Sequence, residues 1–390
     1  MDIEGAGVLC ESLGVHRVLG LSYALASAPA VLVALGGCTA DKGDSTGSTT
    51  AAGTTQGTGT AAGVGGASNG GTGTGGAAGS GATDAGSMAE AAGAAGSDGS
   101  ADGDTGAGTG PVMPVQRNGR WALDLGDLSF EVDPQIGGRV TTFALATVNL
   151  LTGPDVNVDN WGSTFWTSPQ SVWNWPPPPQ IDNQPYAVNA SATALVLTGT
   201  TSPAIGVNVT KTFSLDRAAG AVRIDYGVTN QSQMQVRLAP WEVTRVVSRG
   251  LTFFPTGTRS MISAGGTLPT TNSGGVTWFA YDAATILADS KLYADGAEGW
   301  LAHVAQGLVF IKRFVDVPAN MQAPGEGDVE LFTNLAHTYI ELEDQGSYAT
   351  LAPQSSTSWT VTWYLKRLPA DIAATTGNAA LVQFVRDTIR

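Results

Sequence analysis

The sequence is poor in cysteine and histidine, and this shortage excludes several kinds of site. It has two Cys, Cys10 and Cys38, and three His among 390 residues. Two thiols cannot build a disulfide framework or a thiolate metal site. The two His of the C-terminal part, His303 and His337, do not stand at a spacing typical of metal ligands. We therefore expect no bound metal and no cofactor.

Basic side chains are also scarce. Lys and Arg together number 19 against 33 Asp and Glu, so the formal net charge is −14. A nucleic-acid-binding protein needs a basic stripe that neutralises phosphates, and a chain of this charge has none. We therefore exclude nucleic acid as a partner, whereas the oligomeric state stays open.

Aromatic residues are missing from one long stretch. From Thr39 to about Val112 the chain consists mainly of Gly, Ala, Ser and Thr, and all 10 Trp lie at or beyond Trp121. Such a composition cannot bury enough apolar surface to offset the entropy lost on ordering the backbone. We predict a disordered linker over residues 39–114 and one folded domain over residues 115–390.

Residues 1–38 have the pattern of a targeting segment. An apolar run ends in LGGC, which resembles the bacterial lipobox, so we expect cleavage before Cys38 and lipidation of its thiol. An ordinary secretory signal with a chance Cys is the alternative. Thr39 after the Cys favours the outer membrane of a Gram-negative cell, reached through the lipid anchor only. The start, MDIEGAGVLCE, is acidic where a basic segment is expected, so we expect translation to begin near Val15.

The folded part is predicted to be all-β. Apolar and polar residues alternate in VNVTKTFSL, VRIDYGV and WTVTWYL, which is the period of half-buried strands. Many such segments at short spacing indicate a large antiparallel sandwich. Only the end departs from this pattern, because Asn378 can cap a helix on which Leu381, Val385 and Ile389 recur at helical spacing.

The stretch WGSTFWTSPQSVWNWPPPP concentrates four of the ten Trp and four consecutive Pro. Indole rings stack on the C–H faces of sugars, so one interpretation makes the segment a wall of a saccharide pocket. The alternative is a Trp- and Pro-rich plug that closes one end of a sandwich. The four residues concerned are Trp161, Trp166, Trp173 and Trp175.

Two further segments hold candidate acid–base groups. In TYIELED, Tyr339, Glu341 and Glu343 share one strand face, which either lines a cleft or faces solvent. In a cleft, repulsion between the carboxylates raises one pKa and suits general-base work. In RLAPWEVTR, the side chains of interest are Trp241, Glu242 and Arg245, and Arg245 pairs either with Glu242 or with a ligand.

The order of these pieces resembles the galactose-mutarotase-like supersandwich family. The resemblance runs from SFEVDPQIGGRVTTFAL, which contains Arg139, through the tryptophan segment to VELFTN, YIELED and LAPQSSTSWTVTWYL. It implies a β-supersandwich with a sugar ligand. It also implies that Glu343 stands at the position of the catalytic base, while Trp241 replaces the His that acts as acid.

Three hypotheses follow. The first is a carbohydrate-binding domain without standard aldose 1-epimerase activity, whose cleft is formed by the tryptophan segment, Arg139, Glu242 and Glu343. The second is an epimerase-type enzyme with Glu343 as base and Glu242 as acid, which must approach one sugar from two sides. The third is a structural protein whose tryptophan segment is core and borders no cavity. Further candidate ligand contacts are Trp241, Arg245 and Glu341.

Overall fold

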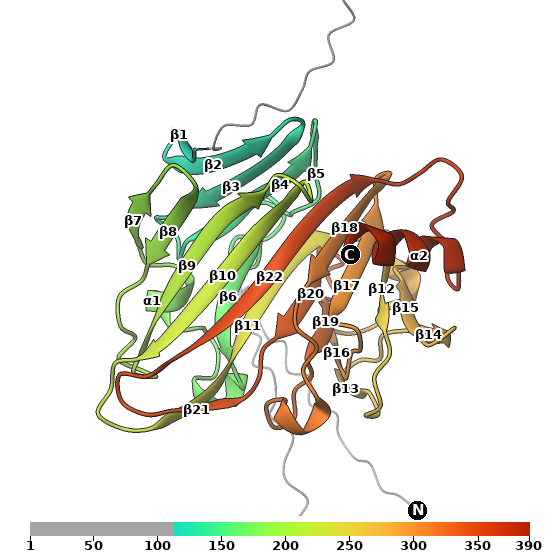
Figure 1. Cartoon of the computed structure of the whole chain (residues 1–390). Helices are drawn as coiled ribbons and strands as arrows, with labels where there is room; N and C mark the ends of the chain where they lie inside the picture. The colour runs from blue at the N-terminus through green and yellow to red at the C-terminus, as the bar shows by residue number, and fades with distance from the viewer. Residues whose placement is uncertain (1–112) are drawn as a thin grey trace, which may run out of the picture. The chain divides into compact units, whose positions relative to one another are not determined.

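The computed structural model describes residues 113–390, which form two large antiparallel β-sheets packed face to face (Figure 1). The predicted signal segment 1–38 with Cys38, and residues 39–112 of the predicted linker, lie outside the described residues. The predicted all-β class, the antiparallel sandwich and the short C-terminal helix are confirmed.

Sheet A contains twelve strands, in the order β1-β2-β3-β4-β6-β11-β20-β19-β16-β13, with β5 paired to β4 and β21 paired to β11. Their bounds are β1 Val115–Arg117, β2 Arg120–Leu125, β3 Leu128–Asp133, β4 Arg139–Leu145, β5 Val148–Asn149, β6 Ser163–Ser168, β11 Val236–Val247, β13 Ile262–Gly265, β16 Ser290–Ala294, β19 Val329–Thr333, β20 Tyr339–Gln345 and β21 Ala349–Leu351.

Sheet B contains ten strands, in the order β14-β15-β12-β17-β18-β22-β10-β9-β8-β7. Their bounds are β7 Ala187–Ala190, β8 Ala194–Thr198, β9 Val207–Asp216, β10 Ala221–Asn230, β12 Leu251–Pro255, β14 Thr270–Ser273, β15 Val276–Ala280, β17 Trp300–Ala305, β18 Leu308–Arg313 and β22 Ser356–Arg367. The helices are α1 Pro179–Asp182, α2 Ala379–Thr388 and the 3-10 turns η1 Gln170–Val172, η2 Ala283–Thr285 and η3 Ala319–Met321.

The alternating segments of the sequence form the middle of sheet B. Along β9 and β10, buried residues alternate with half-exposed ones, as the two-residue period predicts. Strand β22 lies between β10 and β18 and pairs with both, so it joins the two halves of the sheet. In Figure 1 it is the long red strand that crosses the front of the molecule.

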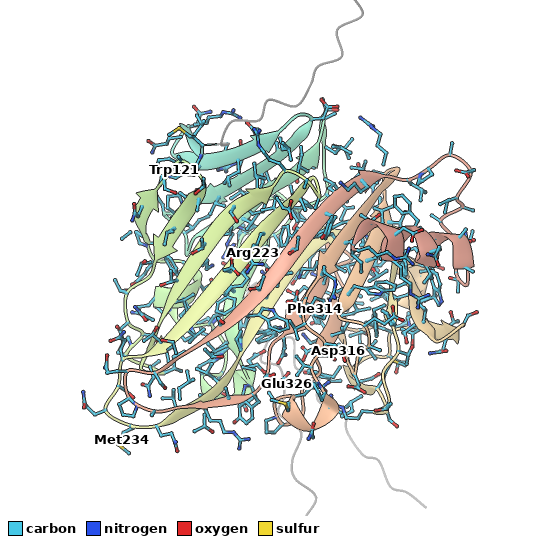
Figure 2. The ribbon with its side chains drawn as sticks, viewed as in Figure 1. Trp121, Arg223, Met234, Phe314, Asp316 and Glu326 are labelled. Carbon is cyan, nitrogen blue, oxygen red and sulfur yellow. The ribbon has the colours of Figure 1, made fainter. Side chains whose placement is uncertain are left out.

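Aromatic side chains fill the space between the sheets. Phe130 of β3 and Phe143 of β4 meet Trp363 of β22 at ring-centroid distances of 5.9 and 5.2 Å. Phe310 of β18 lies 4.9 Å from the same indole. Edge-to-face contacts of this kind stabilise a core beyond the area they bury. Figure 2 shows how densely side chains occupy this interior.

Helix α2 covers part of the outer face of sheet B, beside β17 and β12 (Figure 1). The side chain of Asn378 accepts a 3.0 Å hydrogen bond from the backbone N–H of Ala380, as the predicted cap requires. Leu381 and Val385 pack with Trp278 and Trp300 in a second, smaller core. Among residues 113–390, no helix is both long enough and apolar enough to cross a membrane.

Candidate functional site

The tryptophan segment covers the outer face of sheet A, which points away from sheet B. Trp166 of β6 and Trp241 of β11 are register partners whose rings meet edge to face at 5.2 Å. Trp173, directly after η1, packs against Trp166 at 5.9 Å, and its indole N–H donates to the carbonyl of Thr167 at 2.7 Å. These three indoles form a packed layer, in which Trp166 is buried and Trp173 is partly buried against the core.

A cavity of about 500 Å³ opens beside this layer. We name it the Trp175 pocket, because Trp175 is 41% exposed and forms one wall. Pro176, Pro177 and Pro179 continue that wall, and proline restricts the backbone to preordered geometry. The side chains of Arg139, Asp159, Asn160, Trp161, Trp175 and Asp182 all line this pocket.

Arg139, at the start of β4, is the cation of this pocket and is only 4% exposed. Its guanidinium lies 5.0 Å from the Trp161 ring, donates to the carbonyl of Asp159 at 2.9 Å and contacts Asp182 at 3.4 Å. Its Nε has no hydrogen-bond partner in the described part of the chain. Burial lowers the pKa of Arg139 to about 10, although Asp182 opposes the shift. A buried donor without a partner favours a ligand that accepts a hydrogen bond.

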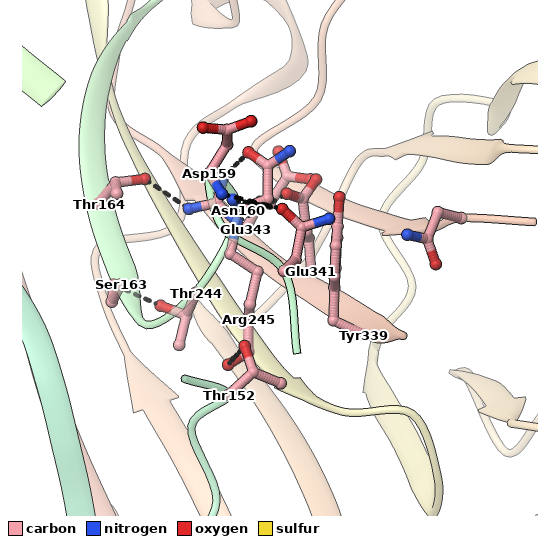
Figure 3. Close-up of polar contacts among 12 residues, drawn as sticks. Thr152, Asp159, Asn160, Ser163, Thr164, Thr244, Arg245, Tyr339, Glu341 and Glu343 are labelled. Atoms are coloured by element: carbon pink, nitrogen blue, oxygen red, sulfur yellow. Dashed lines mark hydrogen bonds and ion pairs between the residues drawn. The ribbon is translucent and has the colours of Figure 1, made fainter. Parts of the chain in front are cut away.

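The pocket wall is connected to a charged cluster on the outer face of β11 and β20. Arg245 Nε donates to Glu341 Oε1 at 2.8 Å, and its Nη2 contacts the Asn160 amide oxygen of the pocket at 3.5 Å (Figure 3). The guanidinium also lies 4.9 Å from the Trp166 ring. Burial raises the pKa of Glu341, and Arg245 opposes that rise. Arg245 therefore pairs with Glu341 and not with Glu242.

Glu343 lies further along the same face and is fully buried. Lys291 of β16 contacts both its carboxylate oxygens at 2.5 Å and Glu330 of β19 at 2.8 Å. The Trp241 indole N–H donates to Glu343 Oε2 at 2.8 Å. Burial alone lowers the pKa of Lys291, but Glu330 and Glu343 raise it well above its usual value. The cluster is thus a closed ion network, and of the two alternatives for this strand face the solvent-exposed one is wrong.

Two loops account for this burial. Glu326, in the loop before β19, accepts a hydrogen bond from the backbone of Gln170 in the tryptophan segment. Glu326 lies at the lower end of the domain in the view of Figure 2. Strand β20 is consequently buried on both faces, although its sequence alternates.

Glu242 projects to the opposite face of sheet A, into the core between the sheets. There it pairs with Lys312 of β18 at 2.8 Å and accepts hydrogen bonds from Tyr226 at 2.6 Å and from Trp363 at 2.9 Å. Its register partner on β20, Asp344, contacts the same lysine at 2.7 Å. Successive residues of a strand point to opposite faces, so Glu242 cannot share a cleft with Trp241 or Glu343. The predicted acid–base pair is separated by the sheet.

The structure thus brings Arg139, Trp161 and Trp175 to one pocket, with Arg245, Glu341 and Glu343 behind its wall. The sequence reasoning missed Asn160, Asp182, Lys291 and Glu330. Glu330 carried a usable signal, because it alternates with Val329 and Leu331 as Glu341 does with its neighbours. Among residues 113–390, no group of three or more His, Cys, Asp or Glu is arranged to hold a metal ion.

A family model described as a domain of unknown function, DUF4380, matches residues 151–366, which is more than half of the chain. The chain belongs to the DUF4380 family. The matched range includes the tryptophan segment from Trp161 on, both faces of β11 and β20, and the closing strand β22. Arg139 lies before the match.

Solved structures similar to this DUF4380 chain include a protein from Synechocystis sp. PCC 6803, at 14% identity and a TM-score of 0.43 over 67% of this chain and 98% of that one. A putative aldose 1-epimerase from Escherichia coli K12 aligns at 14% identity and 0.40 over 64% and 99%. A galactose mutarotase-like protein from Clostridium acetobutylicum aligns at 10% identity and 0.40 over 67% and 100%. The comparison with curated proteins gives no match.

Proposed function

We propose that this domain binds a neutral saccharide in the Trp175 pocket and is not a standard aldose 1-epimerase. The observation that carries the proposal is the joint placement of an exposed indole and a buried guanidinium with an unsatisfied N–H in one 500 Å³ cavity. An apolar wall with a few oriented polar groups is the usual composition of a small-molecule site. The wall suits a pyranose C–H face, and the polar groups suit its hydroxyls.

Charge favours a neutral ligand over an acidic one. The pocket contains one cation, Arg139, and two carboxylates, Asp159 and Asp182. Asp182 is also held by the Trp166 indole N–H at 2.8 Å, so its second oxygen stays near Arg139. An added carboxylate meets net repulsion in this partly desolvated site, whereas hydroxyl groups donate to Asp and Asn oxygens and accept from Arg139.

The test is a titration of intrinsic Trp fluorescence with neutral hexoses and, in parallel, with uronic acids. We expect a saturable change with at least one neutral hexose and a weaker or absent one with its uronic acid. Trp175→Ala removes the change, while Trp121→Phe, which alters an indole of β2 outside the pocket, retains it. A folded chain that responds to none of these sugars contradicts the proposal.

The epimerase alternative has less support. A base and an acid have to reach one substrate, yet Glu343 is closed in by Lys291 and Trp241, and Glu242 faces the other side of the sheet. The residue in place of the expected acid is Trp241, whose N–H already donates to Glu343. An anomerisation assay by polarimetry measures this point, and turnover lost in Glu343→Gln contradicts the binding-only proposal.

We also propose, from the sequence, that Cys38 anchors the chain to the outer membrane of a Gram-negative cell through a lipid. Its LGGC motif and the Gly-, Ser- and Thr-rich tether that follows support this proposal. The test is metabolic labelling with a radioactive fatty acid. Incorporation that is lost in Cys38→Ala supports the anchor, and equal labelling of both chains contradicts it.

A further inference from the structure

A second cavity, of about 370 Å³, is lined in part by the middle of the same tryptophan segment. Thr167, Ser168 and Val172 line it, so we name it the Val172 pocket. Its other walls come from the loop between β8 and β9 (203–206) and from the start of β11 (236–238). The two cavities therefore share one continuous segment, whose middle lines the Val172 pocket and whose start and end line the Trp175 pocket.

The lining of the Val172 pocket has the chemistry of a sugar subsite. Ile205 and Val236 supply apolar surface. Ser168 is 1% exposed, and its hydroxyl has no hydrogen-bond partner among the described residues. An unsatisfied buried hydroxyl is destabilising, and a ligand hydroxyl that bonds to it removes this cost. Arg237 lies over the Tyr348 ring at 4.3 Å, and a stacked guanidinium directs its N–H groups outward from its edge.

Only Trp173 and Asn174 separate Val172 of one pocket from Trp175 of the other. Val172 and Trp175 are three residues apart, so their Cα atoms lie within about 11 Å of each other. They are 55% and 41% exposed, which leaves apolar surface uncovered at both ends of that short span. Each of these exposed side chains borders a cavity, so a ligand that fills both pockets covers both of them.

We infer that the two pockets are subsites for one ligand, an oligosaccharide that lies across the tryptophan segment from Trp175 to Val172. This inference rests on the proposed saccharide binding and adds that the natural ligand is a polymer or a polymer fragment. Each occupied subsite adds its own interactions without a second loss of translational freedom, so affinity rises with chain length until both pockets are filled.

The test is isothermal titration calorimetry of the full chain with malto-, cello-, xylo- and β-1,3-gluco-oligosaccharides, each from monosaccharide to hexasaccharide. We expect at least one series to bind at least ten-fold more tightly when lengthened. Val172→Asp and Arg237→Ala remove that gain and leave the monosaccharide affinity unchanged. Trp175→Ala weakens every length. Leu287→Asp, which changes a residue that is 82% exposed and outside both pockets, is the matched control.

The outcomes separate the two proposals. A monosaccharide that binds with no gain on lengthening overturns the extended site and leaves the Trp175 pocket as a single sugar site. If the increase in affinity with oligosaccharide length persists in both Val172→Asp and Arg237→Ala, the inference is also overturned, because the added sugar units then bind outside the Val172 pocket. If no sugar of any length binds, the proposed saccharide-binding function itself is overturned.

Discussion

The indole N–H of Trp241 donates a 2.8 Å hydrogen bond to Glu343, so the residue that replaces the expected catalytic acid is bound to the residue at the expected base position. An indole N–H is a donor that does not give up its proton at ordinary pH. The pair therefore holds Glu343 in place and supplies no proton-transfer partner. Lys291, 5.1 Å from the Trp241 ring, completes this arrangement.

Lys291→Met is expected to lower the free energy of unfolding by about 3–5 kcal/mol, because it leaves Glu330 and Glu343 buried without their cation. Urea denaturation at pH 7 measures the loss. The matched control is Arg223→Met, which removes an exposed pair with Asp225 and costs about 1 kcal/mol or less. The deficit of Lys291→Met should shrink as the pH falls, because burial raises the pKa of Glu330 well above its usual value and protonation removes that stranded charge. Equal losses of unfolding free energy in both variants would contradict the role of Lys291 as the buried cation that neutralises Glu330 and Glu343.

Glu242→Gln is expected to destabilise the fold by about 2–3 kcal/mol without changing sugar affinity. The carboxylate accepts from Tyr226 and Trp363 and pairs with Lys312, all in the core between the sheets. Denaturation and fluorescence titration of the same preparation give both quantities. A variant of unchanged stability with lost binding would place Glu242 in a ligand site after all.

Trp166→Ala and Trp175→Ala form a matched pair within one segment. Trp166 is 4% exposed and packs against three other indoles, so its truncation should cost about 3–5 kcal/mol. Trp175 is 41% exposed, so its truncation should cost about 1 kcal/mol or less and act on ligand affinity instead. Thermal unfolding measures the loss of stability in each variant. A larger loss for Trp175→Ala than for Trp166→Ala would contradict the assignment of Trp166 to the packed layer and of Trp175 to the pocket wall.

Asp328→Asn tests how the free energy of unfolding depends on pH. Burial, together with Asp295 and Asp316, raises the pKa of Asp328 to about 6, while the backbone N–H of Gly296 opposes the rise. The folded state therefore binds this proton more tightly than the unfolded state, whose Asp pKa is about 3.9. The stabilisation that the Asp328 proton contributes is fully present below about pH 4 and is lost as the pH rises through about 6.

The variant removes the titrating proton and retains an oxygen that accepts the 2.7 Å hydrogen bond from Gly296. Its unfolding free energy should vary less between pH 4 and 6 than that of the unaltered chain, by about 2–3 kcal/mol across the window. Urea titrations at several pH values measure the slope. Asp387→Asn, on the exposed face of α2, serves as the comparison, and an identical slope in all three chains would disprove the prediction.

Sequence patterns predicted the strands that are buried on one face. Residues 207–216, 221–230 and 356–367 alternate and form β9, β10 and β22, and Asn378 caps α2 as expected. The pattern could not determine the environment of Glu341 and Glu343, because their exposure depends on loops that are distant in sequence. Gln170 and Glu326 are more than 150 residues apart and meet over the sheet face.

The partners of Glu242 could not be predicted from the local sequence either, because they lie on strands that are distant in the chain. Strand β11 is buried on both faces, so neighbouring Trp241 and Glu242 each needed a polar partner. The partners, Glu343 and Lys312, come from different sheets. Only the register of β11 with β20 decides which side chain meets which partner.

The position of β22 has a consequence for synthesis. Since β10 and β18 are joined only through this strand, a ribosome that has made residues 113–355 has produced two half-sheets with open edges. Open edges pair with other chains, so the nascent polypeptide has to be shielded until residues 356–367 emerge. Cooperative closure of the domain thus waits for one of its last strands, and a chain that ends between residues 314 and 355 leaves the facing edges of β10 and β18 unpaired.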